Sequence, residues 1–216
     1  ARFIKKRKKL RLMKIKNGEF IEVDFVGRIK DTKEVFDLTK EDIAKENNIY
    51  NPNFQYKPII ICVGEGQLLN GLDKELIGKE AGKYKIELKT EDAFGKKNLK
   101  LLRLVPVTIF RKENLKPFPG LNVNIDGIIG TIRSVSGGRV IVDFNHPLAG
   151  KDIIFDFEIK RIIKEDKEKV ESLVSKLSKE FEVSVKEQKA EIKAKLGEKE
   201  KEFLKEKINK LIPNIK

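Results

Sequence analysis

The chain has 216 residues, of which 39% are hydrophobic, enough for more than one small core, so a disordered protein is excluded. Its only cysteine, Cys62, excludes an internal disulfide, and its only histidine, His146, leaves no zinc site of recognisable spacing. No apolar run reaches the roughly 18 residues of a membrane span, and the N-terminal stretch lacks the apolar part of a secretory signal. We therefore expect a cytosolic protein without a membrane partner, cofactor or metal.

Positive charge is concentrated at the N-terminal end of the chain. The net charge is +13, and residues 1–16 hold nine Lys or Arg and no acidic residue, whereas the body that follows is nearly balanced. Such a run is either a solvated tail or a segment that contacts phosphates without sequence specificity. We expect residues 1–18 to form a basic arm, with RNA or the ribosome as its candidate partner.

The first folded segment reads as a small antiparallel sheet with a short helix. Alternating apolar and polar residues predict a strand over residues 19–29, followed by a turn at 31–32. A short helix at 40–45 within a longer loop, a buried strand at 59–63, a helix at 68–77 that Gly78 ends, and a strand at 84–88 follow.

Turn residues divide the next stretch into short segments. Strands are predicted at 121–125, 128–135 and 139–144, the first two joined by the Asp126-Gly127 hairpin turn. We predict a small all-β domain over residues 96–148. Because a strand at 153–162 fits the first sheet better than this insert, the first domain is expected to be discontinuous, comprising residues 19–95 and 149–163.

Residues 164–216 form a third kind of sequence. Apolar residues recur at helical spacing from Val170 to Phe181, a hairpin is expected over 181–185 and 190–194, and a second amphipathic helix covers 203–212. A helix-hairpin-helix α+β module of about 50 residues is marginal alone. It therefore either packs against the rest of the chain or offers a surface to a client or to a second copy in a homodimer.

Six motifs follow one another along the chain: residues 23–27 (VDFVG), 35–37 (VFD), 64–72 (GEGQLLNGL), 92–95 (DAFG), 145–150 (NHPLAG) and 154–158 (IFDFE). In this order they resemble the motifs of FKBP-type peptidyl-prolyl cis-trans isomerases. The likeness is nearest to the SlyD-like, archaeal long-type members, which carry an inserted chaperone domain and an extra C-terminal domain. The resemblance covers residues 19–163. It implies an α+β fold with an FKBP-like antiparallel sheet, a short helix and an inserted all-β domain of the IF type.

The resemblance also implies an apolar site rather than an acid–base site. It assigns Asp37 as the single polar side chain, Leu72 as the floor and the Leu69 N–H as a donor to the substrate carbonyl. Phe25 and Phe94 stand where a tyrosine is usual in the family. The full set of implied site residues is Phe25, Phe36, Asp37, Ile61, Leu68, Leu69, Leu72, Phe94 and Phe155.

Such a pocket suits rotation about an X-Pro bond, whose barrier is roughly 18–20 kcal/mol. Apolar walls that remove water from the planar amide favour the less polar, twisted transition state. The resemblance implies a prolyl isomerase and folding chaperone that acts on unfolded or proline-containing polypeptides, captured by the insert. The alternative, suggested by the basic arm and the missing tyrosine hydroxyls, is a non-catalytic holdase associated with ribosomes or RNA.

Overall fold

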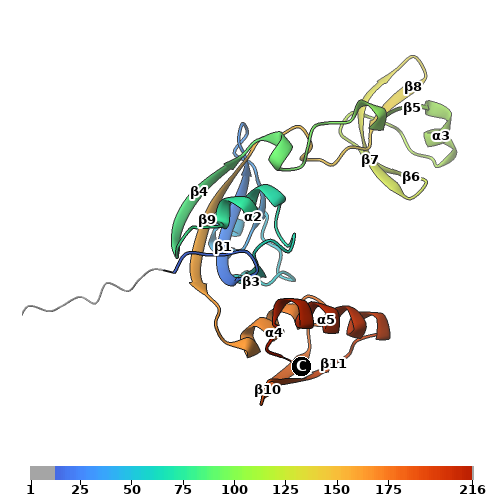
Figure 1. The fold of residues 1–216 in the computed structure, drawn as a ribbon. Helices are drawn as coiled ribbons and strands as arrows, with labels where there is room; N and C mark the ends of the chain where they lie inside the picture. The colour runs from blue at the N-terminus through green and yellow to red at the C-terminus, as the bar shows by residue number, and fades with distance from the viewer. Residues whose placement is uncertain (1–12, 216) are drawn as a thin grey trace, which may run out of the picture. The chain divides into compact units, whose positions relative to one another are not determined.

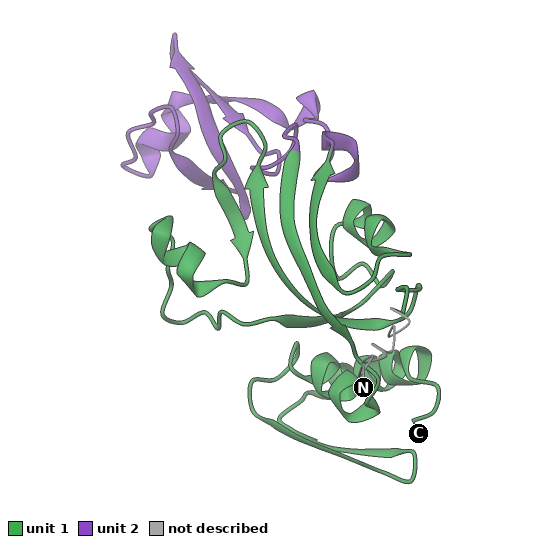
Figure 2. Cartoon of the chain, turned by 90° about the vertical axis from the view of Figure 1, so that its left-hand side faces the viewer, with its two compact units in different colours: residues 1–88, 153–216 green, residues 89–152 purple. Residues whose placement is uncertain are grey.

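The computed structural model describes residues 13–215, so most of the basic arm predicted for residues 1–18 lies outside the described residues. The described chain forms two compact units (Figure 2). Unit 1 runs to Leu88 and resumes at Ile153, and unit 2 comprises Lys89–Asp152. Both combine helices with antiparallel strands, which confirms the α+β class. None of the described helices is long and apolar enough to cross a membrane.

One antiparallel sheet organises unit 1 (Figure 1). Its strand order is β2-β1-β9-β4, and β3 pairs with β1 on the same edge as β2. Strand β9 follows unit 2 in the sequence and, as predicted, belongs to this first sheet, where it lies between β1 and β4. The strands are β1 (Phe20–Ile29), β2 (Val35–Leu38), β3 (Ile59–Cys62), β4 (Gly82–Leu88) and β9 (Ile153–Ile162).

Two short helices accompany this sheet. Helix α1 (Glu41–Glu46) places Ala44 in a cluster with Val26, Val35 and Leu38, which covers one face of β1 and β2. Helix α2 (Asn70–Leu76) packs against β4 and buries Leu72 and Leu76. Both helices had been predicted, whereas β2 had been recognised only as part of a motif.

The end of the predicted arm belongs to the fold. The Ile15 side chain is 1% exposed, its N–H donates to the Lys79 carbonyl, and its own carbonyl accepts from the Gly78 N–H. The arm was expected to extend to residue 18, but this boundary needs correction. Buried main-chain groups are paired within the fold, and those of Ile15 are paired with residues 78 and 79. Residues 15–18 are therefore tied to the turn after α2 and to the end of β3, where the Gly18 N–H donates to the Val63 carbonyl.

Unit 2 contains a four-stranded antiparallel sheet of order β5-β8-β7-β6. The all-β expectation needs one addition, because the short helix α3 follows Pro106 and contributes the buried Phe110 to the core of the sheet. The elements are η1 (Thr90–Asp92), η2 (Leu99–Leu101), β5 (Leu102–Pro106), α3 (Val107–Lys112), β6 (Asn122–Ile125), β7 (Ile128–Ser136) and β8 (Arg139–Asp143).

The C-terminal module (residues 164–215) packs against the sheet of unit 1. Phe20, Cys62 and Ile163 share one buried cluster with residues of both C-terminal helices. Packing within the chain, one of the two expected alternatives, is thus observed. The elements are α4 (Asp166–Val174), β10 (Phe181–Lys186), β11 (Lys189–Ala194) and α5 (Glu198–Leu211).

Candidate functional site

Phenylalanine rings from β1 and β9 meet on one face of the unit 1 sheet. Residues directly opposite each other in an antiparallel pair point to the same face, and Phe25 is opposite Phe157 while Gly27 is opposite Phe155. The Phe25 and Phe157 rings stack with centroids 6.0 Å apart, and the Phe25 and Phe155 rings meet edge to face at 5.9 Å. The register of two strands therefore builds one wall of an aromatic cluster.

A bulge in the pairing of β2 with β1 adds a further ring. Gly27 is opposite Asp37 but Arg28 is opposite Val35, so the register of the two strands shifts at Phe36. Bulges re-aim side chains, and the Phe36 ring lies edge to face with Phe155, with centroids 5.7 Å apart. Phe36 is half-buried, whereas Phe25 and Phe155 are buried.

Gly27 is the residue of this cluster to which sequence analysis assigned no role. A Cβ atom there would lie 2.7 Å from Cζ of Phe36 and 2.8 Å from Cε1 of Phe155. The missing side chain is what allows the two rings to approach the strand. A glycine within an otherwise apolar strand often marks such a close approach, and this signal was present in the sequence.

Asp37 brings the one carboxyl of the predicted set to this face. The residue is exposed, and no Lys or Arg among residues 13–215 forms an ion pair with it. Loss of hydration raises the pKa of this carboxyl above its ordinary value, against the opposing effect of a hydrogen bond from the Leu38 backbone. Asp37 is thus a polar group in surroundings that disfavour its charge.

The loop that carries Leu68 and Leu69 is tied to its neighbours by side chains. Gln67 Oε1 accepts from the Cys62 N–H at 3.1 Å, and Asp73 Oδ2 accepts from the Gly66 N–H at 3.3 Å. Leu69 precedes α2, and its carbonyl accepts from the Leu72 and Asp73 N–H groups. Within residues 13–215 we find no acceptor for the Leu69 N–H, which leaves it available to a ligand.

Three further predicted site residues differ from the ring residues of unit 1 in their burial or in the unit that carries them. Ile61 and Leu72 are 2% and 1% exposed, so they are buried supports rather than accessible walls. Phe94 belongs to unit 2, where its ring stacks on His146 with centroids 4.6 Å apart. His146 is also engaged through Nδ1, which accepts from the Leu148 N–H at 3.1 Å.

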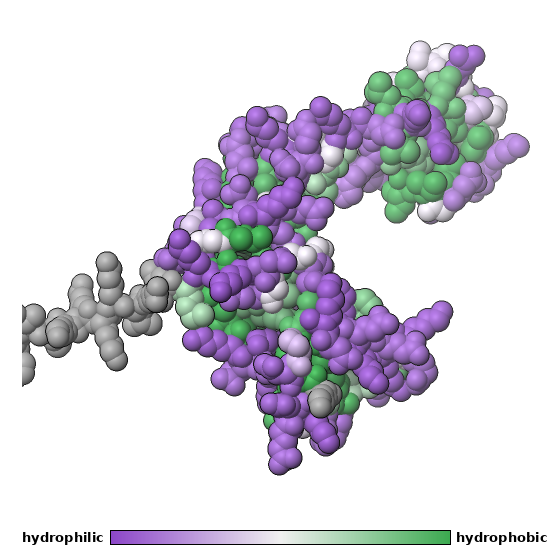
Figure 3. All heavy atoms as spheres, in the orientation of Figure 1, coloured by the Kyte–Doolittle hydropathy of each residue, from purple (hydrophilic) through white to green (hydrophobic). Residues whose placement is uncertain are grey.

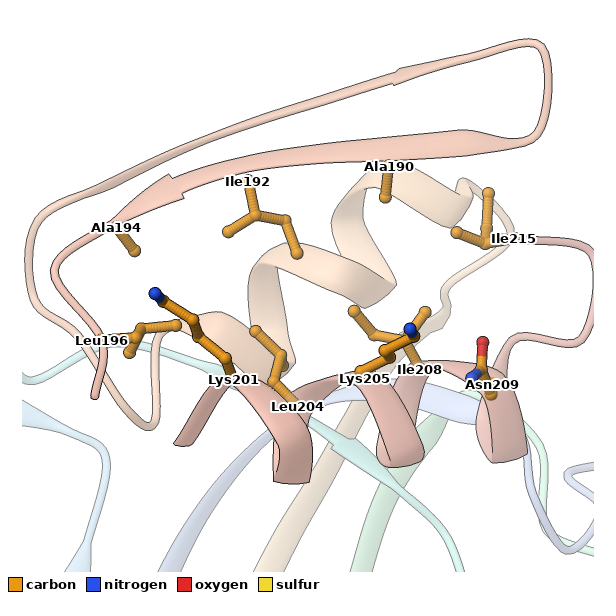
Figure 4. Close-up of a pocket in the computed structure, with 10 residues that line it drawn as sticks. All are labelled: Ala190, Ile192, Ala194, Leu196, Lys201, Leu204, Lys205, Ile208, Asn209 and Ile215. Carbon is orange, nitrogen blue, oxygen red and sulfur yellow. The ribbon is translucent and has the colours of Figure 1, made fainter. Parts of the chain in front are cut away.

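A separate apolar cavity of about 310 Å³ lies in the C-terminal module, and sequence analysis did not single it out. It lies between the inner side of β11 and one side of α5, with Lys201 and Lys205 among its lining residues (Figure 4). Its apolar lining includes Ala190, Ile192, Leu196, Leu204, Ile208 and Ile215.

Comparison with known proteins gives consistent matches. The family model for FKBP-type peptidyl-prolyl cis-trans isomerase matches residues 13–107, and the model for the FKBP26 IF domain matches residues 103–148. A short-type peptidyl-prolyl cis-trans isomerase of Methanocaldococcus jannaschii is 34% identical over 149 residues, which are 68% of this chain and 94% of that protein.

Two bacterial relatives match shorter parts of the chain. A probable FKBP-type 16 kDa peptidyl-prolyl cis-trans isomerase of Pseudomonas fluorescens is 35% identical over 112 residues, 49% of this chain and 73% of that protein. The FKBP-type isomerase SlyD of Helicobacter pylori is 29% identical over 119 residues, 52% of this chain and 63% of that protein.

Proposed function

The chain belongs to the FKBP-type peptidyl-prolyl cis-trans isomerases, and on this premise we propose that it rotates X-Pro bonds at the aromatic cluster of unit 1 while unit 2 captures the polypeptide client. The observation that carries the proposal is that the Phe36 and Phe155 rings lie against the side-chain-free backbone of Gly27, with the Phe25 ring edge to face with Phe155. A proline ring is a compact apolar group that such a cluster accommodates.

The physical basis of the proposed reaction is desolvation. Water stabilises the planar, polar amide more than the twisted one, so transfer of an X-Pro bond to an aromatic surface favours the transition state. No proton has to be transferred, which fits a site with one carboxyl and no histidine among its assigned residues. The Leu69 N–H, for which we found no acceptor among residues 13–215, would hold the carbonyl that precedes the proline.

Asp37 would supply orientation rather than acid–base chemistry. Its raised pKa reflects a carboxyl that loses hydration, and a donor brought by the substrate would compensate for that loss. Phe25 replaces a tyrosine that is usual in the family, so this chain offers no hydroxyl at that position. We therefore assign polar contact with the substrate to Asp37 and the Leu69 backbone.

Client capture is assigned to the surface of unit 2. Large apolar side chains remain exposed there, including Leu104 at 56%, Phe118 at 55% and Ile129 at 71%. Hydrophobic residues gather on the face of this unit seen in Figure 3. Exposed apolar patches mark interaction sites, and binding a client to the same chain raises the effective concentration of its prolines at the pocket.

The decisive experiment compares Phe36→Ala with Phe118→Ala in the isomerisation of a short hydrophobic-X-Pro peptide. Phe36 is half-buried in the cluster, and Phe118 is an exposed phenylalanine of unit 2. Each variant therefore removes one phenyl ring, but only Phe36→Ala removes it from the proposed site. We expect Phe36→Ala to lower kcat/KM and Phe118→Ala to leave it unchanged. An inactive wild-type chain, or equal activity in both folded variants, would refute the assignment.

The alternative function is a non-catalytic holdase associated with ribosomes or RNA, and it rests on the basic arm. Its discriminating variant is deletion of residues 1–12, which spares the buried Ile15. A holdase of this kind requires polyanion binding that is lost on deletion and weakens steeply with salt. The isomerase reading requires peptide turnover that survives the deletion.

A second copy of the chain is the partner we propose for the C-terminal module. Support comes from the apolar cavity between β11 and α5, whose lining includes the half-buried Ile192 and Leu196. The test is the molar mass in solution, measured by light scattering for the wild-type chain and for Ile192→Asp. A wild-type dimer that the substitution dissociates supports the proposal, and a monomeric wild-type chain contradicts it.

A further inference from the structure

We propose that Glu65 is a positioning residue through which the C-terminal module holds the loop of the isomerase pocket. This inference rests on the proposed function. Glu65 lies in the loop that carries Leu68 and Leu69, and its carboxylate is bound by two lysines of α5. It gives residues 164–215 a role in the site, although they lie outside the part of the chain that carries the family motifs.

The contact is a double ion pair with little exposure. Glu65 Oε2 is 2.9 Å from Lys207 Nζ, and Glu65 Oε1 is 2.8 Å from Lys210 Nζ. The Glu65 side chain is only 12% exposed. Hydrogen bonds from Lys210 and Lys207 lower the pKa of Glu65, so the carboxylate stays charged. Because residues three apart share a helix face, one side of α5 presents both lysines together.

Helix α5, which supplies these lysines, is held in place by buried packing. Leu204 and Ile208 of α5 are buried in the cluster that includes Phe20 and Cys62 of the isomerase sheet. Arg161 of β9 adds an ionic tie, because its guanidinium binds Glu22 of β1 at 2.8 Å and Glu168 of α4 at 2.7 Å. The module thus holds α5 against the sheet, so the positions of Lys207 and Lys210 are set by this packing.

Besides Glu65, the loop is restrained by the Gln67 and Asp73 hydrogen bonds and by close packing at Gly64. Gly64 and Gly66 flank Glu65 at φ +86° and +65°, conformations that favour glycine. Glycines also have more backbone freedom in the unfolded chain, so this segment needs contacts that hold it in one conformation. A Cβ at Gly64 would lie 1.7 Å from Oδ1 of Asn17, so the loop also packs tightly there. The Glu65 clamp, together with the Gln67 and Asp73 hydrogen bonds, therefore determines where the following leucines lie.

Removal of either side of the clamp leaves an unbalanced set of charges. Without Glu65, Lys207 and Lys210 face a neutral loop, and without the lysines a nearly buried carboxylate loses its partners. In both cases we expect residues 66–69 to move more freely and the pocket to lose preorganisation. Because both changes break one unit, their effects should not add.

The test uses the full chain and three variants, Glu65→Gln, Lys207→Gln with Lys210→Gln, and all three changes together. Lys199→Gln is the matched control, because Lys199 is an exposed lysine of the same helix that forms no ion pair with the described loop residues 64–69. Amide hydrogen exchange of residues 66–69 and peptide kcat/KM are measured well below the unfolding temperature, so that all variants stay folded.

We expect about tenfold faster exchange in the loop and a matching fall in kcat/KM for each clamp variant, with the triple variant no worse than Glu65→Gln. The double variant Lys207→Arg with Lys210→Arg should retain both properties. If exchange in the clamp variants is unchanged, or is faster while kcat/KM stays the same, Glu65 does not have the proposed role. The isomerase function itself would still stand, provided that the wild-type chain is active. An inactive wild type overturns the proposed function, and with it this role of Glu65.

Discussion

Phe36 and Phe155 meet edge to face at an interplanar angle of 84°, and both rings lie against the backbone of Gly27. The two phenylalanines are far apart in the sequence and come from opposite neighbours of β1. Their contact depends on three features at once: the register of β9, the bulge of β2 and the absence of a side chain between them.

The first prediction concerns Gly27→Ala. The new methyl group would overlap both rings, so we expect displaced rings, lower peptide kcat/KM and a loss of about 1 to 3 kcal/mol of stability. Gly130→Ala is the matched control, because its Cβ would lie 2.7 Å from Val142 and 2.8 Å from Phe144 in unit 2. Equal losses of peptide turnover in the two variants would show that overpacking alone explains the effect.

Asp37→Asn tests the carboxyl of the site. We expect slower peptide isomerisation with an unchanged circular dichroism spectrum.

Because folding raises the Asp37 pKa, ionisation costs the folded state stability above that pKa, and the cost disappears below the ordinary pKa of 3.8. The Asn variant should therefore be more stable than wild type at pH 7 but not below pH 3.8. Urea titrations at both pH values check this, with Asp31→Asn as the control, and normal turnover in Asp37→Asn would remove Asp37 from the site.

Asp143 should determine the acid stability of unit 2. Burial of this side chain favours the neutral acid, but hydrogen bonds from Asn145, Arg133 and Lys97 outweigh burial and lower its pKa to about 2. Its contribution is present above the ordinary value of 3.8 and is lost as pH falls towards about 2. We expect Asp143→Asn to cost about 2 kcal/mol at pH 7.

Urea titrations followed by the amide signals of β7 and β8 measure this cost. The difference between wild type and Asp143→Asn should shrink as the pH is lowered from 7 to 3. A difference that stays constant with pH would mean that packing, rather than charge, accounts for it. Asp126→Asn, in the hairpin turn of the same unit, serves as the control substitution.

Client capture predicts a split between two assays. Phe118→Ser and Ile129→Ser replace side chains that are 55% and 71% exposed, so neither should unfold unit 2. We expect both variants to catalyse proline-limited refolding of a protein less well than wild type, with unchanged turnover of a short peptide. A parallel loss in both assays would instead assign these residues to the reaction itself, and no loss in either would remove them from client binding.

Local pattern was sufficient for much of the fold. Alternation predicted β1 and β9, the Asp126-Gly127 turn predicted the β6–β7 hairpin, and helical spacing predicted α4 and α5. These signals work because side-chain periodicity and turn conformation are properties of a few neighbouring residues. The motifs in turn indicated the family, which the comparisons show.

Other features depended on contacts between distant segments, which no local pattern records. Ile15 looked like part of a charged arm until its burial beside the turn after α2 was seen, and Phe110 lay in a stretch without a clear helical period. The sequence by itself determined most of the helices and strands and the family to which the chain belongs. Only the tertiary structure decided that a bulge brings Phe36 to Phe155 and that α5 binds Glu65, because strand register and helix docking are set by the packing of the whole unit.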